Sequence, residues 1–122
     1  MVKALSIRQP WAWLIIAGHK DIENRSCDTN YRGPPLIHAG RTWAGMPIDK
    51  IERRYRLKIQ REKLLRGGII GIVELVDVVT RHRSRWFDGD SFGWVLKNPR
   101  SLRFRKMNER LGLFEAKSRG AK

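Results

Sequence analysis

Three charged residues, Lys20, Glu23 and Arg25, have the types and the spacing of a small polar site. Glu23 and Arg25 are two residues apart on a segment expected to be extended, so their side chains point to the same face. Lys20 follows a predicted helix end and turns toward that face. A carboxylate between two cations stays ionised, and the cations keep donors for a phosphate or a base edge. The spacing alone favours an ordinary surface ion-pair cluster, which contributes little stability.

A second group of polar residues consists of Arg8, Gln9 and Arg32, together with His38. Arg8 precedes a predicted helix start whose free amides favour an anion, so the two are expected to hold one phosphate, unless Arg8 only shields the end of its strand. Arg32 lies in a turn and faces either the same site or water. His38, in an apolar strand, is expected to be a hydrogen-bonded core histidine rather than a ligand or a base.

Positive charge is concentrated in two parts of the chain. The sequence has 26 Lys and Arg against 12 Asp and Glu, which gives a formal charge of +14. Residues 50–66 carry eight basic and two acidic side chains, residues 97–122 carry nine and two, and residues 67–96 are almost neutral. Charge of this density causes self-repulsion in a small domain, so a polyanionic partner is expected.

The basic residues of 50–66 are expected to form the phosphate-binding face of one long helix. Contacts to a nucleic-acid backbone are assigned to Arg53, Arg54, Lys58 and Arg61, and Arg103 and Arg105 extend the same surface. If about six phosphates are neutralised, the logarithm of the affinity falls with the logarithm of the salt concentration at a slope of roughly −4 to −5. The alternative is a solvated helix face.

Two tryptophans are candidates for stacking on bases. Trp43 and Trp86 lie in polar segments that contain glycine, where an aromatic ring either stacks on a base or caps one end of a barrel. No cofactor and no metal are expected, because the three histidines have no metal-ligand spacing and no glycine-rich phosphate loop is present. Cys27 is the single cysteine and is interpreted as a spectator thiol.

Length and composition exclude several other classes of protein. A chain of 122 residues allows one domain, assigned to residues 1–116, with a loose basic tail over 117–122. The hydrophobic fraction of 41% excludes a disordered basic tail as the whole protein. The longest uncharged run, residues 9–19, is too short to span a membrane, and no secretory signal is recognised. A cytoplasmic protein without membrane contact is therefore the default expectation, and the charge favours a monomer.

The order of the predicted elements indicates an α+β fold. Pro10 opens a short helix and Gly18 ends it, and Pro47 opens a longer helix that ends before Gly67. The predicted helices are residues 9–18 and 47–66, and the predicted strands are residues 5–7, 21–25, 36–39, 69–80, 91–96, 102–104 and 111–114. Since strands outnumber helices, the prediction is a small mixed β-barrel flanked by two or three α-helices.

Seven short blocks in this order resemble one known family. One is the pattern Gly18-x-Lys20-x-x-Glu23-x-Arg25, and the others are residues 5–12, 31–33, 37–39, 71–77, 97–99 and 111–114. From Leu5 to about Phe114 the chain resembles the activating signal cointegrator homology (ASCH) domain, of the PUA-like superfamily. The resemblance implies a β-barrel with a cleft for nucleic acid, usually RNA, and it places Lys20, Glu23 and Arg25 in that cleft. Cys27 departs from the pattern, because the family commonly has Trp there.

The sequence therefore predicts a domain that binds nucleic acid, with RNA as the expected partner and DNA as the alternative. The second hypothesis is an enzyme, because the resemblance extends to small members that hydrolyse acetylated cytidine and to proposed ribonucleases, with Lys20 as the matching lysine. The amidohydrolases have Thr where this chain has Glu23, so their nucleophile is missing, and Lys20 with Glu23 would serve acid–base catalysis on a ribose hydroxyl. A third hypothesis is a DNA-binding or transcription-coactivator interaction domain.

Overall fold

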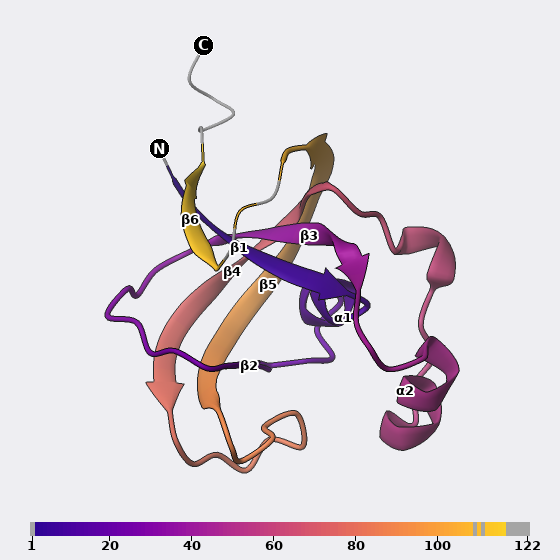
Figure 1. Ribbon diagram of the computed structural model, residues 1–122, viewed down its shortest axis with the longest axis horizontal. Helices are drawn as coiled ribbons and strands as arrows, with labels where there is room; N and C mark the ends of the chain where they lie inside the picture. The colour runs from indigo at the N-terminus through magenta and orange to yellow at the C-terminus, as the bar shows by residue number, and fades with distance from the viewer. Residues whose placement is uncertain (1, 109, 111, 117–122) are drawn as a thin grey trace.

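Six strands form one mixed sheet that curves into a half-barrel (Figure 1). They are β1 (Val2–Gln9), β2 (Ile22–Arg25), β3 (Leu36–Trp43), β4 (Gly68–Val79), β5 (Phe92–Lys106) and β6 (Leu113–Ala116), in the spatial order β2-β5-β4-β3-β1-β6. β1 and β3 run parallel, and all other neighbouring pairs are antiparallel. The predicted α+β class and barrel-like sheet are confirmed.

The computed structural model describes residues 2–108, 110 and 112–116. The predicted basic tail, residues 117–122, and Leu111 of the last predicted strand lie outside the described residues. None of the helices in the described part is long and apolar enough to cross a membrane.

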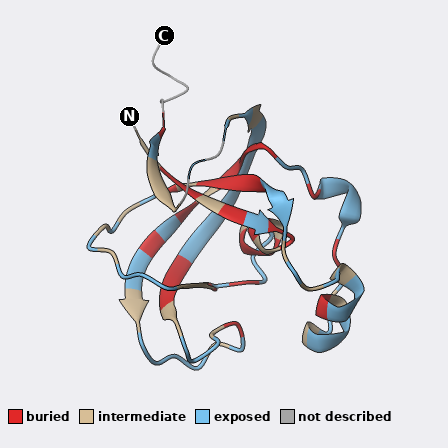
Figure 2. Ribbon diagram, in the orientation of Figure 1, coloured by how far each residue is buried: buried red, intermediate tan, exposed pale blue. Residues whose placement is uncertain are grey.

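The first helix, α1 (Trp11–Ile16), packs against β1, β3, β4 and β5. Its buried side chains, Ala12, Leu14 and Ile15, divide between the two larger clusters of the hydrophobic core. Gly18 follows the helix with a φ of +89°, the left-handed conformation expected of a glycine at this position. The predicted position of this helix is confirmed, and Figure 2 shows the buried residues concentrated in α1 and the strands around it.

Gly71 of β4 allows α1 to lie close to the sheet. A Cβ at this position would lie 2.5 Å from Cδ1 of Ile16 and 2.6 Å from the carbonyl oxygen of Arg100. Gly71→Ala is therefore expected to destabilise the protein by about 1–3 kcal/mol, measured by chemical unfolding. Gly45→Ala is the matched control, because a Cβ there meets nothing within 4 Å. Equal unfolding free energies for the two variants would contradict this packing.

The second helix is much shorter than the sequence indicated. α2 (Ile48–Tyr55) ends at Arg56, which has a φ of +52°, and a short 3₁₀ turn, η1 (Arg61–Lys63), follows an extended stretch. The prediction of one helix over 47–66 is wrong. The cause is Glu52, whose carboxylate accepts hydrogen bonds from the amide of Ile59 (2.8 Å) and from the guanidinium of Arg61 (3.2 Å), so that the chain folds back beside the helix.

This carboxylate should make the folded state sensitive to acid. The hydrogen bond from Ile59 and then that from Arg61 lower the pKa of Glu52 from its ordinary value of 4.5. A lowered pKa in the folded state adds stability above about pH 4.5 that is lost as the pH falls through the folded-state value. Between about pH 5 and about pH 3, the unfolding free energy of the wild type should thus fall more than that of Glu52→Gln. Glu62→Gln is the control and should lose as much unfolding free energy as the wild type. An equal loss in the wild type and in Glu52→Gln would contradict the assigned role of Glu52.

β5 is one strand of 15 residues, where two separate strands were predicted. It pairs with β4 through three shifts of register, and one of these contains Asn98 with a φ of +52°. Asparagine tolerates this conformation, and the bulge accommodates Pro99 at the edge of the sheet. β2 pairs only with residues 92–95 of β5, so the rest of β5 has β4 as its single strand partner within the described residues.

Candidate nucleic-acid cleft

Two adjoining hollows form a cleft beside β2, one of the two edge strands of the sheet. The first, called the Arg8 hollow, has a volume of about 500 Å³ and lies between β2 and the segment that leads into β6. The second, called the Tyr55 hollow, has a volume of about 320 Å³ and is lined by residues of α2 and of the segment 85–88. Trp11, Glu23 and Asn24 line both, so the two hollows are connected.

The structure brings Lys20, Glu23 and Arg25 together at this junction. Nζ of Lys20 lies 3.9 Å from one carboxylate oxygen of Glu23, and a guanidinium nitrogen of Arg25 lies 3.5 Å from the other. β2 carries Glu23 and Arg25, and their side chains are on the same face of the strand, as the two-residue spacing predicts. The side chains are 5%, 13% and 18% exposed, so this cluster is far more buried than the surface ion pair that the spacing alone favoured.

Aromatic rings surround the lysine. Nζ of Lys20 lies 5.2 Å from the ring centroid of Trp11 and 5.4 Å from that of Trp86, while the guanidinium of Arg25 lies 5.3 Å from the ring of Trp94. Ring faces attract cations, and this attraction partly replaces the hydration that burial removes. The cluster is therefore held from two sides, by a carboxylate and by indole rings.

Burial shifts both members of the Lys20–Glu23 pair toward their neutral forms. It lowers the pKa of Lys20, against the attraction of Glu23, Asp21 and Asp88. It raises the pKa of Glu23, against the attraction of Lys20 and Arg25. Shifts in these directions arise where ionisable groups are held together away from water, and they occur in structural ion pairs as well as in functional sites.

Asn24 fixes the segment that carries Trp86. Its side-chain amide donates a hydrogen bond to the carbonyl oxygen of Trp86 (2.8 Å), and its side-chain oxygen accepts one from the amide of Asp88 (3.0 Å). Trp86 in turn stacks on Tyr55 of α2, with ring centroids 4.0 Å apart and planes at 18°. Arg85 donates a hydrogen bond to the carbonyl oxygen of Tyr55 (2.8 Å). β2, α2 and the segment 84–88 thus form one wall around Lys20.

The other predicted cleft residues are distributed differently. Arg8 lines the Arg8 hollow together with Arg25 and Arg110. Gln9 is fully buried, where its amide donates to the carbonyl oxygen of Leu65 (2.8 Å) and its oxygen accepts from the amide of Trp13 (2.9 Å). Arg32 donates to the carbonyl oxygens of Thr29 and Tyr31 and lines neither hollow. The geometry therefore places both side chains outside the cleft. Gln9 links the start of α1 to the segment before β4, and Arg32 binds carbonyl oxygens of its own turn.

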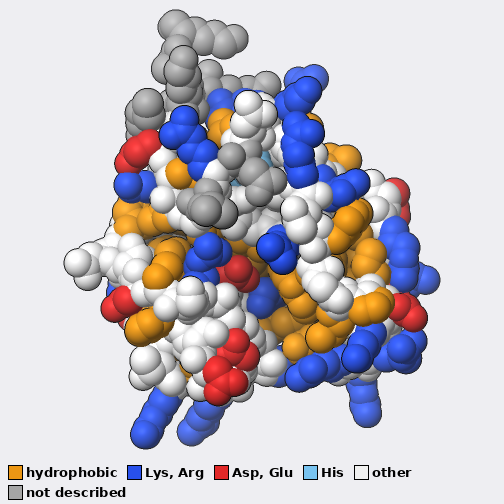
Figure 3. Space-filling model, viewed as in Figure 1, with side chains coloured by type: hydrophobic (Ala, Val, Ile, Leu, Met, Phe, Trp, Pro, Cys, Tyr) orange, Lys and Arg blue, Asp and Glu red, His pale blue; other side chains and the backbone are white. Residues whose placement is uncertain are grey.

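The basic residues do not share one helix face. Arg54 lines the Tyr55 hollow, whereas Arg53 on the same helix pairs with Asp49 at 3.1 Å. Lys58 and Arg61 follow the end of α2. Arg103 and Arg105 lie on the outer half of β5, the part after residue 96 that does not pair with β2. The face seen in Figure 3 has Lys and Arg at many points of its margin, with hydrophobic side chains exposed between them. The charge is spread over several elements because the predicted long helix does not form.

Neither candidate stacking tryptophan offers an open face in the cleft. Trp86 lines the Tyr55 hollow, but it is only 4% exposed and Tyr55 covers one face of its ring. Trp43 is 41% exposed at the end of β3, outside both hollows, and the guanidinium of Arg66 lies 4.4 Å from its ring centroid. The alternative role, in which a tryptophan caps one end of the barrel, fits the packing of Trp86 better.

Several residues of the cleft were not singled out from the sequence. Asn24, Tyr55 and Arg85 had no assigned role in a site. Their contacts join segments about 30 to 60 residues apart, as in the bonds from Arg85 to Tyr55 and from Asn24 to Trp86. The only local signal was the neighbourhood of Asn24, which lies between two residues already assigned to the site.

His38 is a core residue, as predicted. It is fully buried, and its Nε2–H donates to the carbonyl oxygen of Met107 at 2.7 Å, while Nδ1 lies 3.3 Å from the hydroxyl of Ser6. Within residues 2–108, 110 and 112–116, no group of three or more His, Cys, Asp or Glu side chains is arranged to hold a metal ion.

Residues 5–106 match the family model of the ASCH domain, and the chain belongs to this family, which is generally linked to RNA binding. The chain is 29% identical over 111 residues to activating signal cointegrator 1 of Mus musculus and 28% identical over 111 residues to that of Homo sapiens. Each match covers 80% of this chain and 19% of the relative, so the chain spans about a fifth of the length of these proteins.

The fold is similar to the crystal structure of a point mutant of the ASCH protein from Zymomonas mobilis. The TM-score is 0.59 at 14% sequence identity, and the superposition covers 94% of this chain and 89% of the other.

Proposed function

We propose that the protein binds single-stranded RNA and holds one unstacked nucleotide in the cleft. The observation that carries this proposal is the convergence of Lys20, Glu23 and Arg25 at the junction of two connected hollows. One hollow has an aromatic wall and the other contains three arginines, and these are the two chemistries that a base and a phosphate require.

The Tyr55 hollow suits a base or a nucleoside. Its volume of about 320 Å³ lies at the lower end of the range for small-molecule pockets. Trp11 and Tyr55 provide apolar walls, and Lys20 and Glu23 provide a donor and an acceptor for the edge of a base. A base can enter only when it is not stacked in a duplex, so the proposal favours single strands.

The Arg8 hollow suits the phosphate next to that base. Arg8, Arg25 and Arg110 line it, together with Ser6 and Ile7. Guanidinium groups bind phosphate oxygens in pairs of hydrogen bonds, which makes such contacts stronger than those of neutral donors. The basic residues outside the cleft then contact the adjoining backbone without selecting a sequence.

Fluorescence anisotropy titrations with labelled single-stranded RNA, duplex RNA and duplex DNA, each at two salt concentrations, test the proposal. The single strand should bind most tightly, and Lys20→Ala should remove that preference. Affinity for all three polymers should fall as salt rises. Equal affinity for the single strand and both duplexes in the wild type would contradict a cleft that takes an unstacked base.

Two neighbouring arginines of α2 give a matched comparison. Arg54 lines the Tyr55 hollow, whereas Arg53 points to Asp49. Arg54→Ala is expected to weaken binding of single-stranded RNA about threefold to tenfold, and Arg53→Ala less than about twofold, since an exposed pair on a helix contributes little. The measurement is the same anisotropy titration, and a larger effect for Arg53→Ala would show that the RNA backbone follows the face of α2 that carries Arg53 and Asp49.

Hydrolysis of RNA or of an acylated nucleoside is the second candidate function. It is favoured by one observation, the contact between a lysine of lowered pKa and a glutamate of raised pKa. Such a pair suits the transfer of a proton to or from a ribose hydroxyl. Turnover of labelled RNA or of acetylcytidine that Lys20→Ala abolishes would favour this function over binding alone.

A further inference from the structure

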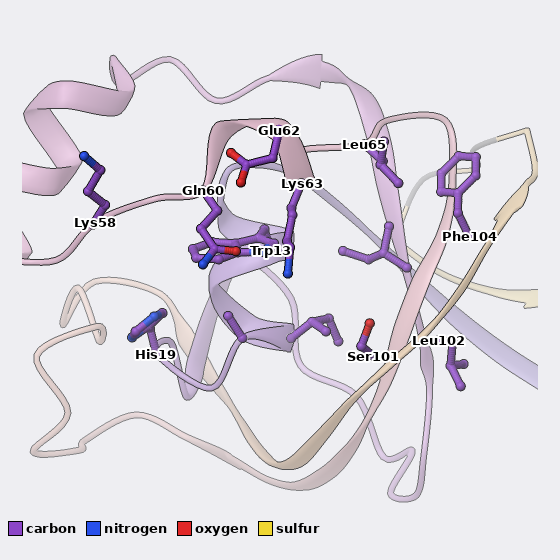
Figure 4. A pocket seen from close by; sticks show the side chains of 13 residues that line it. Trp13, His19, Lys58, Gln60, Glu62, Lys63, Leu65, Ser101, Leu102 and Phe104 are labelled. Atoms are coloured by element: carbon purple, nitrogen blue, oxygen red, sulfur yellow. The ribbon is translucent and has the colours of Figure 1, made fainter.

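A third concave surface lies apart from the cleft. This surface, called the Trp13 groove, has a volume of about 560 Å³, and its lining comes from α1 and the residues after it, the segment 58–65, β4 and the outer half of β5 (Figure 4). It shares no lining residue with either hollow of the cleft. Trp11 faces the cleft and Trp13 faces this groove, because residues two apart on a helix point to nearly opposite sides.

The groove exposes hydrophobic surface. Five large hydrophobic residues are exposed to solvent in the described part of the chain. Three of them line the groove: Leu65 (46%), Leu102 (41%) and Phe104 (37%). Trp13 and Ile16 add further apolar surface. An exposed apolar patch with a polar rim is typical of a protein–protein contact.

Positive charge borders this apolar surface. The segment 58–66 carries four basic residues and one acidic residue, and the segment 97–106 carries five basic residues and none that is acidic. Lys58 and Lys63 line the groove together with one carboxylate, Glu62, and within the described residues neither lysine has a carboxylate within salt-bridge distance. A partner that fits this surface must therefore combine apolar side chains with negative charge.

We propose that the Trp13 groove binds an acidic peptide segment of a partner protein, with its aliphatic or aromatic side chains against Leu65, Leu102 and Phe104. Its carboxylates contact Lys58 and Lys63 at the rim. A second copy of this chain is disfavoured as the occupant, because its net charge of +14 would be repelled. RNA is disfavoured because most of the apolar lining is aliphatic, whereas bases gain most from aromatic faces.

Labelled synthetic peptides test this inference with the full chain. The main probe is a peptide of about 12 residues in which Leu and Phe alternate with Asp and Glu, at about 150 mM salt to suppress non-specific attraction. One control peptide has Ser in place of Leu and Phe, and the other has Lys in place of Asp and Glu. The acidic-hydrophobic peptide is expected to bind at least about tenfold more tightly than either control.

Variants locate the binding site. Leu102→Asp and Phe104→Asp should each weaken binding of the main probe about tenfold, whereas Val76→Asp should not. Val76 is the matched control, since it is a hydrophobic strand residue that is 39% exposed and lines no hollow. Lys63→Glu should also weaken binding, and it adds a test that does not alter the apolar surface. Thermal unfolding verifies that each variant folds.

Three results would overturn the proposal. Equal binding of the Ser-containing control would show that charge alone attracts the probe. If Leu102→Asp and Lys63→Glu both bind the probe as tightly as the wild type does, the peptide binds outside the Trp13 groove. Displacement of the probe by single-stranded RNA, together with weaker RNA binding by Leu102→Asp, would make RNA the occupant. Lys20→Ala should leave peptide binding unchanged, because Lys20 does not line the groove. Failure of the RNA-binding proposal can therefore be told apart from failure of the peptide-binding proposal.

Discussion

Lys20→Met is expected to lower the affinity for single-stranded RNA about tenfold to a hundredfold, while the protein stays folded. The ammonium is the most buried cation of the cleft, and hydrogen bonds to charged groups contribute about 1.5–3 kcal/mol each. Methionine keeps the length of the side chain and packs well against the rings of Trp11 and Trp86, so the wall of the Tyr55 hollow should persist. Anisotropy titrations and thermal unfolding measure the two effects separately.

The control for this substitution is Lys50→Met, which removes the same charge from an exposed position of α2. It should reduce the salt dependence slightly and leave the preference for single strands unchanged. A Lys20→Met protein that binds within twofold of the wild type would mean that the nucleotide does not contact the Lys20 ammonium.

Asn24→Ala is expected to release the segment 84–88 from β2 and to weaken RNA binding about tenfold. The substitution removes two hydrogen bonds, one to the carbonyl oxygen of Trp86 and one from the amide of Asp88. Each bond contributes about 1 kcal/mol, and the carbonyl oxygen of Trp86 and the amide of Asp88 must then hydrogen-bond to water instead. Trp86, now 4% exposed, should become accessible to a soluble fluorescence quencher. Quenching of Trp86 therefore distinguishes displacement of the segment 84–88 from loss of a direct contact between Asn24 and the RNA.

Asn30→Ala provides the comparison, since Asn30 is exposed and its side chain makes no hydrogen bond with the part of the chain that is described. It should change neither quenching nor affinity. If Asn24→Ala weakens binding without any increase in Trp86 quenching, Asn24 contacts the RNA itself and is not a positioning residue.

The parts of the fold that depend on local sequence were predictable. Pro10 and Gly18 bracket α1, and the run of β-branched residues over 69–80 corresponds to β4. The two-residue spacing of Glu23 and Arg25 placed both side chains on one face of a strand. In each case the deciding interaction lies within a few residues of the pattern that reveals it.

The parts that depend on distant contacts were not predictable in this way. The apolar spacing of 48–59 continues past Tyr55, yet the helix ends there because the Glu52 carboxylate binds the Ile59 amide. Likewise, the burial of Lys20 requires Trp86, which is 66 positions further along the chain. The long helix and the surface ion pair were both reasonable local expectations, and the tertiary contacts overrode them.

Chemical-shift mapping of the ¹⁵N-labelled protein with a short single-stranded RNA tests the central claim most directly. The account predicts the largest changes at the backbone amides of residues 20–25 and at the indole signals of Trp11 and Trp86, with smaller changes along α2. Changes confined to segments 58–66 and 97–106, with the cleft signals unmoved at saturation, would contradict it.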